Sequence, residues 1–101
     1  MYIAMNRFRI KPGCEADFEQ IWRQRETFLD EVDGFVSFNL LRGPGSDEQT
    51  LYASHSVWRD RQAFADWTRS EAFRKAHAQA GASRKDVFLG PPQLECFEAV
   101  L

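Results

Sequence analysis

The sequence predicts an α+β domain of the ferredoxin-like type, a β-α-β-β-α-β antiparallel sheet with both helices packed on one face. Two observations predict it. Stretches in which apolar and polar residues alternate, as in strands, are interrupted by two stretches whose apolar residues recur every three or four positions, as in helices. A length of 101 residues, with no internal repeat, suits one domain over residues 1–101 with a single hydrophobic core.

The first strand is predicted over residues 2–10, and a helix follows it and ends at Asp33 and Gly34. Alternation divides the strand between two faces, with Tyr2, Ala4, Asn6, Phe8 and Ile10 on one and Ile3, Met5, Arg7 and Arg9 on the other. The helix carries one mostly apolar stripe, formed by Phe18, Ile21, Trp22, Arg25, Phe28, Leu29 and Val32. This spacing predicts that the helix packs its stripe against the sheet.

The next two strands, over residues 35–42 and 50–58, form a hairpin whose exposed turn is residues 43–49. With the helices on one face of the sheet, the other face is left with exposed apolar side chains. These are expected to be Ile3, Met5, Val36, Phe38 and Leu40. An uncovered apolar face on so small a domain predicts a partner surface, most simply that of a two-fold homodimer.

The second helical region is predicted to be broken in two. Asp60 is a good N-cap for a short helix that carries Trp67, and Ser70 is a good N-cap for a second helix that Gly81 ends. A polar stretch with two prolines then leads to the last strand, over residues 93–101. The break gives the region two separate helix starts over the same sheet.

Composition excludes several classes of function. The chain is 44% apolar and 28% charged, as in ordinary globular proteins, and its net charge of −2 gives no basic footprint for nucleic acid. Its apolar runs are too short to span a bilayer, and its N-terminus lacks the apolar stretch of a signal peptide, so we expect a cytoplasmic protein. Cys14 and Cys96 follow no metal or redox spacing and are expected to be reduced thiols.

Three residues depart from the pattern around them. Asn6 lies on an otherwise apolar strand face, where its amide needs a partner, and taken alone it is better explained by a backbone hydrogen bond than by a ligand. Core packing alone explains Trp67. His77 shares the face of Phe73 beside small alanines, which fits a satisfied core histidine or an axial ligand in a roomy haem pocket. His55, in the middle of a strand, is interpreted as structural.

Three segments carry a resemblance to a known family. Residues 56–77, SVWRDRQAFADWTRSEAFRKAH, resemble the second half of the IsdG-type haem-degrading monooxygenases of the antibiotic-biosynthesis-monooxygenase superfamily. Residues 5–22, MNRFRIKPGCEADFEQIW, resemble the opening of the same family, and residues 31–41, EVDGFVSFNLL, the strand after its first helix. Asn6, Trp67 and His77 match the family's catalytic asparagine, catalytic tryptophan and proximal haem histidine.

The resemblance implies an activity and a set of roles. Haem, both substrate and oxygen-activating cofactor, would bind between the sheet and the broken helix, with His77 as the axial ligand of its iron. Asn6 would reach the distal side, and Trp67 would press on the porphyrin and favour a distorted ring. With molecular oxygen and an external electron donor, the products would be a linear tetrapyrrole and free iron. The family also implies a homodimer whose two sheets close into a barrel.

Other interpretations remain open at this point. A cofactor-free monooxygenase or quinol oxidase of the same superfamily, acting on a polycyclic aromatic, would share Asn6 and Trp67 but would need no axial ligand at His77. A non-catalytic haem-binding dimer would keep His77 without turnover, and a dimer without a ligand would use all three residues for packing. The basic residues around His77 are by default a solvated face, or they meet carboxylates at the mouth of a pocket: Arg74, Lys75, Arg84 and Lys85.

Overall fold

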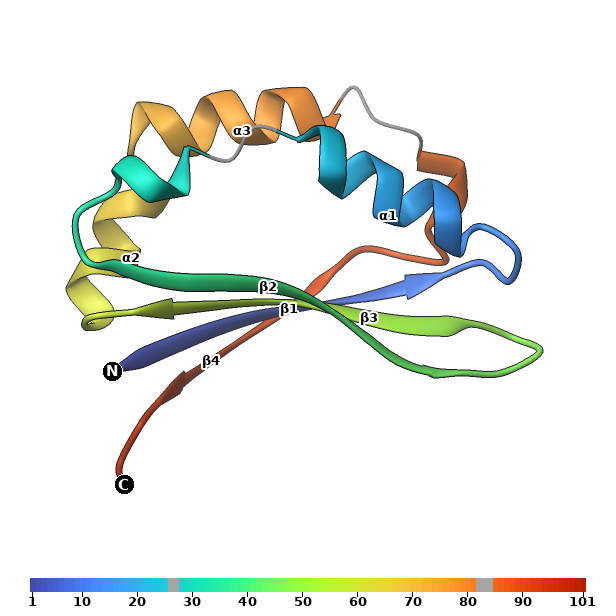
Figure 1. Ribbon diagram of the computed structural model, residues 1–101, viewed down its shortest axis with the longest axis horizontal. Helices are drawn as coiled ribbons and strands as arrows, with labels where there is room; N and C mark the ends of the chain where they lie inside the picture. The colour runs from blue at the N-terminus through green and yellow to red at the C-terminus, as the bar shows by residue number, and fades with distance from the viewer. Residues whose placement is uncertain (26–27, 82–84) are drawn as a thin grey trace.

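The chain forms two layers in the computed structural model of the protein, with the helices on one face of a four-stranded sheet (Figure 1). The structure describes residues 1–25, 28–81 and 85–101, and for residues 77–81 and 85 it describes the backbone alone. Both termini lie at the same end of the sheet, and the turn of the hairpin projects from the other end. The predicted ferredoxin-like α+β class is confirmed.

The sheet has the strand order β2-β3-β1-β4, and each neighbouring pair is antiparallel. The strands are β1 (Tyr2–Ile10), β2 (Phe35–Gly45), β3 (Thr50–Trp58) and β4 (Gln93–Glu98). The predicted bounds of β1 and β3 are correct. β2 runs past its predicted end because pairing with β3 continues into the turn, and β4 ends three residues before the predicted end of the last strand.

The prediction for the uncovered sheet face is wrong at Phe38 and Leu40. The pairing of β2 with β3 shifts across residues 35–37, so that Val36 is an extra residue in the strand. Because side chains alternate between faces, a shift of one residue turns every later side chain to the other face. Phe38 therefore stacks on Trp22 of the first helix, and Leu40 packs against the core beneath the helices.

The uncovered face still carries apolar side chains, as predicted in kind. Ile3 pairs with Phe97 of β4 in register, and Leu41 takes the place on β2 that Leu40 had been expected to fill. Phe97 is 47% exposed and Leu41 42% exposed. His55 pairs with Met5 in register on this same face, away from the helices, and its structural role stays a prediction.

The first helix is shorter than predicted. α1 (Glu15–Gln24) ends before Arg25, whose backbone is extended, with φ −82° and ψ 127°. Leu29–Glu31 form a separate turn of 3-10 helix, η1. The packing explains the break, because the core has two clusters. α1 inserts Phe18 into the first, whereas Leu29 packs against Trp58 in the second. The chain bends to reach both.

The broken second helix is confirmed, with α2 (Arg61–Thr68) followed by α3 (Glu71–Gly81) and, further on, the short 3-10 turn η2 (Lys85–Val87). Both predicted N-caps are present. Asp60 Oδ1 accepts a hydrogen bond of 2.8 Å from the backbone of α2, and Ser70 Oγ accepts one of 3.1 Å from the backbone of α3. These bonds satisfy amide groups that a helix start leaves without partners.

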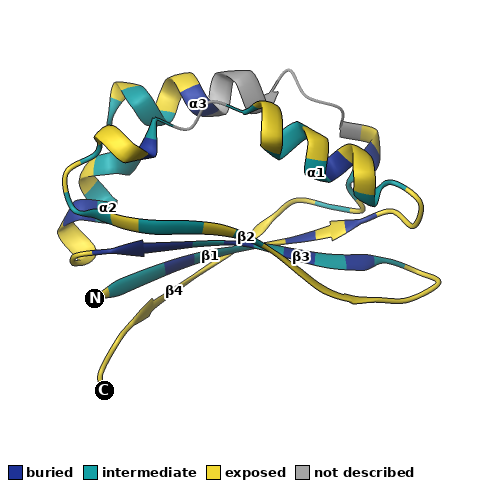
Figure 2. Ribbon diagram, in the orientation of Figure 1, coloured by how far each residue is buried: buried dark blue, intermediate teal, exposed yellow. Residues whose placement is uncertain are grey.

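Side-chain hydrogen bonds tie α1 to the sheet. Tyr52 O–H donates to Glu19 at 2.5 Å, Thr50 Oγ1 donates to Glu15 at 3.0 Å, and Arg42 Nη1 donates to Glu19 at 3.3 Å. The central strands β1 and β3 carry most of the buried residues, while β4 and the far half of β2 are exposed (Figure 2). Cys14 and Cys96 are free, as predicted. The first half of α1 is thus held to the sheet by hydrogen bonds as well as by core packing.

Candidate functional site

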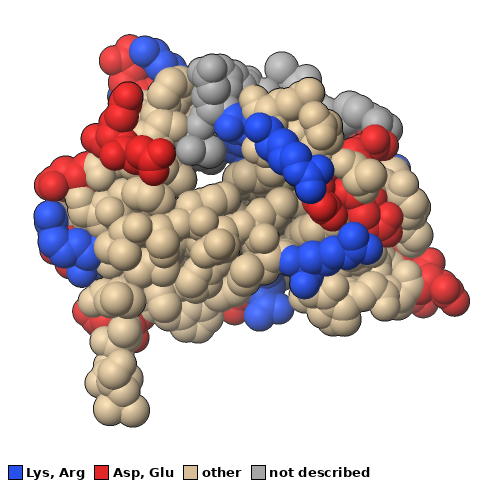
Figure 3. All heavy atoms as spheres, in the orientation of Figure 1, with Lys and Arg blue, Asp and Glu red and all other residues tan. Residues whose placement is uncertain are grey.

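A cavity of about 630 Å³ lies between the sheet and the helix layer. Its volume is typical of a small-molecule site. Residues other than Lys, Arg, Asp and Glu cover the middle of the face seen in Figure 3, and a hollow opens there between the two layers. Most of the residues that line the cavity are apolar. The polar ones among those described are Asn6, Arg25, Ser54, Ser56 and Thr68.

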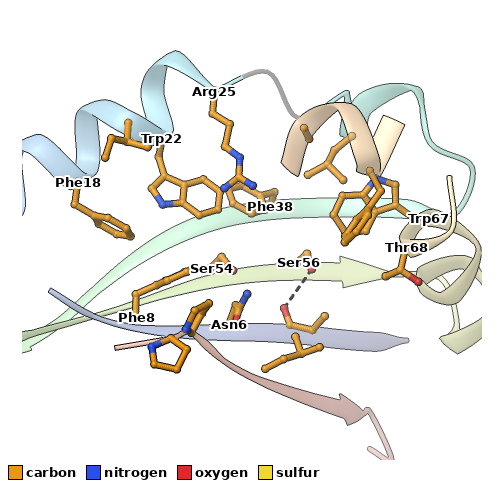
Figure 4. A pocket seen from close by; sticks show the side chains of 18 of the residues that line it. Asn6, Phe8, Phe18, Trp22, Arg25, Phe38, Ser54, Ser56, Trp67 and Thr68 are labelled. Carbon is orange, nitrogen blue, oxygen red and sulfur yellow. Dashed lines mark hydrogen bonds between the residues drawn. The ribbon is translucent and has the colours of Figure 1, made fainter. Parts of the chain in front are cut away.

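Flat aromatic side chains form both ends of the cavity (Figure 4). At one end Trp22 and Phe38 stack with ring centroids 5.5 Å apart and planes at 25°. At the other end the centroid of the Trp67 ring lies 5.2 Å from that of Trp58 and 4.8 Å from that of Phe73. The rings of Trp67 and Phe73 meet edge to face. Walls of this kind favour a flat, largely apolar ligand.

Asn6 rises from β1 into the floor of the cavity (Figure 4). Its Oδ1 atom is buried and accepts no hydrogen bond from any described residue. Its neighbours across the sheet are Ser54 on β3 and Leu94 on β4, and neither side chain forms a hydrogen bond with its amide. A buried amide oxygen without a partner costs about 1–3 kcal/mol, which a ligand that donates to it would recover. The expected backbone partner for Asn6 is absent within the described part of the chain.

The other polar groups of the floor and wall are mostly engaged within the protein. Ser56 Oγ donates to the backbone oxygen of Ala4 at 3.2 Å and accepts from Trp58 Nε1 at 3.0 Å. Thr68 Oγ1 donates to a backbone oxygen of its own helix at 2.7 Å. Ser54 makes no side-chain hydrogen bond to a described residue, which leaves it beside Asn6 as a second polar group of the floor.

The structure brings Asn6 and Trp67 to the same cavity, from β1 and from α2. Trp67 is held by packing on Trp58 and Phe73, so its ring is fixed in orientation as well as in place. His77 lies on α3, next to the buried Ala76 that lines the cavity, but its side chain lies outside the described residues. Its predicted role as axial ligand stays a prediction.

Arg25 is a site residue that the sequence analysis missed, because it was counted as part of the helix stripe. In the structure it is the first residue after α1, and its side chain runs from the helix end into the cavity (Figure 4). Its guanidinium carbon lies 4.5 Å from the centroid of the Trp22 ring. Burial lowers the pKa of the Arg25 guanidinium. An arginine at an apolar stripe position was the available signal.

Two kinds of feature are absent from the described residues. None of their helices is long and apolar enough to cross a membrane. Their His, Cys, Asp and Glu side chains form no cluster of three or more that could hold a metal ion.

Comparison with known proteins identifies the family. Residues 1–79 match the family described as antibiotic biosynthesis monooxygenase. A staphylobilin-producing haem oxygenase from Staphylococcus aureus, strain Newman, is 28% identical over 87 residues, which cover 84% of this chain and 78% of that protein. The resemblance to haem-degrading members that the sequence motifs predict is confirmed.

Solved structures extend the comparison to two chemistries. MhuD, a haem degrader from Mycobacterium tuberculosis with two haems bound in its active site, is 27% identical with a TM-score of 0.75, over 100% of this chain and 97% of that one. SnoaB, a cofactor-independent oxygenase from Streptomyces nogalater, is 25% identical with a TM-score of 0.70, over 99% and 93%. With a family match over residues 1–79 and the same fold in its relatives, this chain belongs to the antibiotic biosynthesis monooxygenase family.

Proposed function

We propose that this protein is a haem-degrading monooxygenase, which binds haem in the cavity between sheet and helices and opens the porphyrin with molecular oxygen and an external reductant. Free iron and a linear tetrapyrrole are the products. One observation carries the proposal: Asn6, with a buried oxygen that no described residue satisfies, and Trp67 line one aromatic-walled cavity. The similarity to a haem oxygenase and to a haem-bound haem degrader supports it.

The residues present fit a haem. The cavity has the volume and the flat aromatic ends that a porphyrin requires, and it holds a polar group at its floor. When bound, haem supplies the redox chemistry of its iron as well as the ring that is oxidised. His77 on α3 is the proposed axial ligand. The apolar lining excludes water from the ring, which keeps reactive species from side reactions.

Asn6 and Trp67 have separate proposed roles. Asn6 offers a fixed amide on the sheet side of the cavity, so it orients the reacting groups by hydrogen bonding. Trp67 is fixed edge-on to Phe73 and close to Trp58, so a bound ring has to adapt to the indole. This rigidity fits the proposal that Trp67 distorts the porphyrin and so favours oxidation of a meso carbon.

The proposed partners follow from the same interpretation. A flat ring and oxygen fit the cavity, and the reductant is an external, as yet unidentified electron donor, since the chain has no flavin or nicotinamide fingerprint. The uncovered sheet face, with the exposed Leu41 and Phe97, is the proposed homodimer surface. We further propose that the protein works in the cytoplasm as a single domain of residues 1–101.

A cofactor-free oxygenase that acts on a polycyclic aromatic or a quinol is the second candidate. The observation that favours it is the similarity to SnoaB, at 25% identity and a TM-score of 0.70. An aromatic cavity with an asparagine on its floor serves both chemistries. His77 discriminates between them, because haem needs an axial ligand and the cofactor-free reaction does not. A non-catalytic haem-binding dimer is separated from both by a test of turnover.

Titration of the purified protein with hemin, followed by ascorbate in air, tests the proposal. A saturable Soret band that then bleaches, with iron released to a chelator, is the expected result. His77→Ala should abolish tight haem binding, while Asn6→Ala should keep binding and lose turnover. Trp67→Phe should bind a flatter ring and degrade it slowly. A band that persists under reductant would indicate a carrier, and the absence of any saturable band would favour the cofactor-free chemistry.

A further inference from the structure

Ser54 places a hydroxyl that the fold does not use on the floor of the cavity. It lies at the centre of β3, lines the cavity and is 9% exposed. Its neighbours across the sheet are Asn6 on β1 and Leu40 on β2, and its hydroxyl forms no hydrogen bond with them or with any other described residue. Burial of a hydroxyl without a partner is unfavourable, so this residue calls for an explanation.

Ser56 shows the same residue type in use by the fold. It lies two positions further along β3, lines the same cavity and is also 9% exposed. Its Oγ donates to the backbone oxygen of Ala4 at 3.2 Å (Figure 4) and accepts from Trp58 Nε1 at 3.0 Å. A strand position that only needed filling would favour a β-branched apolar residue such as valine. The fold therefore accounts for the hydroxyl of Ser56 but not for that of Ser54.

The polar neighbour of Ser54 is Asn6, whose own Oδ1 atom is buried and has no partner among the described residues. The two residues are directly opposite in the pairing of β1 with β3, and Figure 4 shows both on the cavity floor. Side chains placed in this way have Cβ atoms about 5 Å apart, so one oxygen atom in the cavity can contact both. The lining around them is apolar, with Ala4, Phe8 and Leu94.

We propose that Ser54 and Asn6 together bind an oxygen atom carried by the ring of a flat aromatic ligand, so that Ser54 sets a preference for oxygenated rings. A hydroxyl group both donates and accepts hydrogen bonds. A ring hydroxyl therefore donates to Oδ1 of Asn6 while its oxygen accepts from the hydroxyl of Ser54. A site of this kind discriminates against a ring without the oxygen, because its own polar groups are then left unpaired.

The inference deepens the proposed function, on which its haem form rests. A monooxygenase replaces a C–H bond of its substrate by C–OH, using dioxygen and the electrons of its reductant and releasing water. A ring that is to be opened therefore carries an added oxygen before it is cleaved. The pair of Ser54 and Asn6 would retain that ring in the cavity. Both residues lie on paired strands, which hold the two groups in fixed positions.

A matched pair of probes tests the assignment by binding alone. 1-Hydroxypyrene and 1-methylpyrene are flat fluorescent aromatics of similar size that differ in a hydroxyl and a methyl group. Because burial favours the methyl group in itself, the informative quantity is the ratio of the two affinities, hydroxypyrene over methylpyrene. At slightly acidic pH, where the hydroxyl stays protonated, Ser54→Ala should lower this ratio about 3- to 10-fold, the range of one hydrogen bond.

Ser56→Ala is the matched control on the same strand. It should keep the ratio and should lower the unfolding temperature, because it leaves Trp58 Nε1 without its acceptor. Ser54→Ala should do the opposite: without ligand it should unfold at the temperature of the unmodified protein or at a higher one. An unchanged ratio in Ser54→Ala, an equal fall of the ratio in both variants, or a lower unfolding temperature of Ser54→Ala would each overturn the assignment.

The hemin titration separates this inference from the proposed function. If Ser54→Ala lowers the ratio and hemin gives no saturable band with the unmodified protein, the polar pair stands and haem is the wrong ligand. If hemin binds and is degraded while Ser54→Ala leaves the ratio unchanged, haem degradation stands and the assignment of Ser54 is overturned.

Discussion

Replacing Asn6 by leucine should stabilise the ligand-free protein and abolish its activity. The side chain sits on the cavity floor with its Oδ1 atom buried and unbonded to any described residue, a situation that costs about 1–3 kcal/mol. Leucine has a similar size and no polar atom. Because Asn6 is only half-buried and borders the cavity, we expect the lower end of this range, about 1 kcal/mol. For a domain of this size that corresponds to about 4–8 °C in melting temperature.

Thermal unfolding followed by circular dichroism, at one fixed protein concentration, measures the stability change. Fixed concentration matters because a dimer unfolds at a temperature that depends on it. Hemin turnover with ascorbate measures the activity of the same samples, and Asn6→Leu should show almost none. A melting temperature that falls, or a variant that degrades haem at the original rate, would refute the idea that this amide is kept for the ligand at a cost to the fold.

Four further predictions concern the frame around the site. Asp60→Ala removes the N-cap of α2 and should lower the free energy of unfolding by about 1 kcal/mol in urea titrations, with no change in the slope. Gly34→Ala should destabilise the fold in the same assay, because Gly34 has φ +83° and an added Cβ would collide with Ala63; equal stability would contradict this. The hydrogen bond from Tyr52 is the chief cause that lowers the pKa of Glu19. The stabilisation that the ionised Glu19 contributes is therefore present above the ordinary carboxyl pKa and is lost as pH falls through the lowered value. Glu19→Gln should therefore flatten the acid limb of stability against pH. Burial, and then the hydrogen bond to Glu19, raise the pKa of Tyr52 to about 12. The stabilisation that the protonated Tyr52 contributes is therefore complete below the ordinary tyrosine pKa and is lost as pH rises through about 12. Tyr52→Phe should flatten this alkaline part of the curve of stability against pH.

The regular parts of the fold could be predicted from the sequence because each has a strong local signal. The alternation of apolar and polar residues predicts both the bounds and the faces of β1 and β3. The N-cap residues Asp60 and Ser70 predict where α2 and α3 begin. The same alternation put Asn6 beneath the helices, where the structure has it. In these segments local preference and tertiary packing favour the same conformation.

The irregular parts could not be predicted, because packing between distant segments decides them. Nothing in the sequence around Val36 separates a bulge from a regular strand, and the bulge alone decides which way Phe38 points. The apolar spacing of α1 continues to Val32, yet the helix ends at Gln24 because Leu29 is needed in the second core cluster. A periodic pattern reports which residues are buried, and two short elements can satisfy it as well as one long helix.

These two irregularities build one end of the cavity. The bulge in β2 turns Phe38 toward the helices, where it stacks on Trp22 and forms a wall. The early end of α1 frees Arg25 from the helix, and its extended backbone directs the side chain past that wall into the cavity. With a regular strand and a continuous helix, Phe38 would face the uncovered side of the sheet and Arg25 would remain in the stripe. Departures from local rules concentrate where a protein binds or reacts, and here both meet at one end of the cavity.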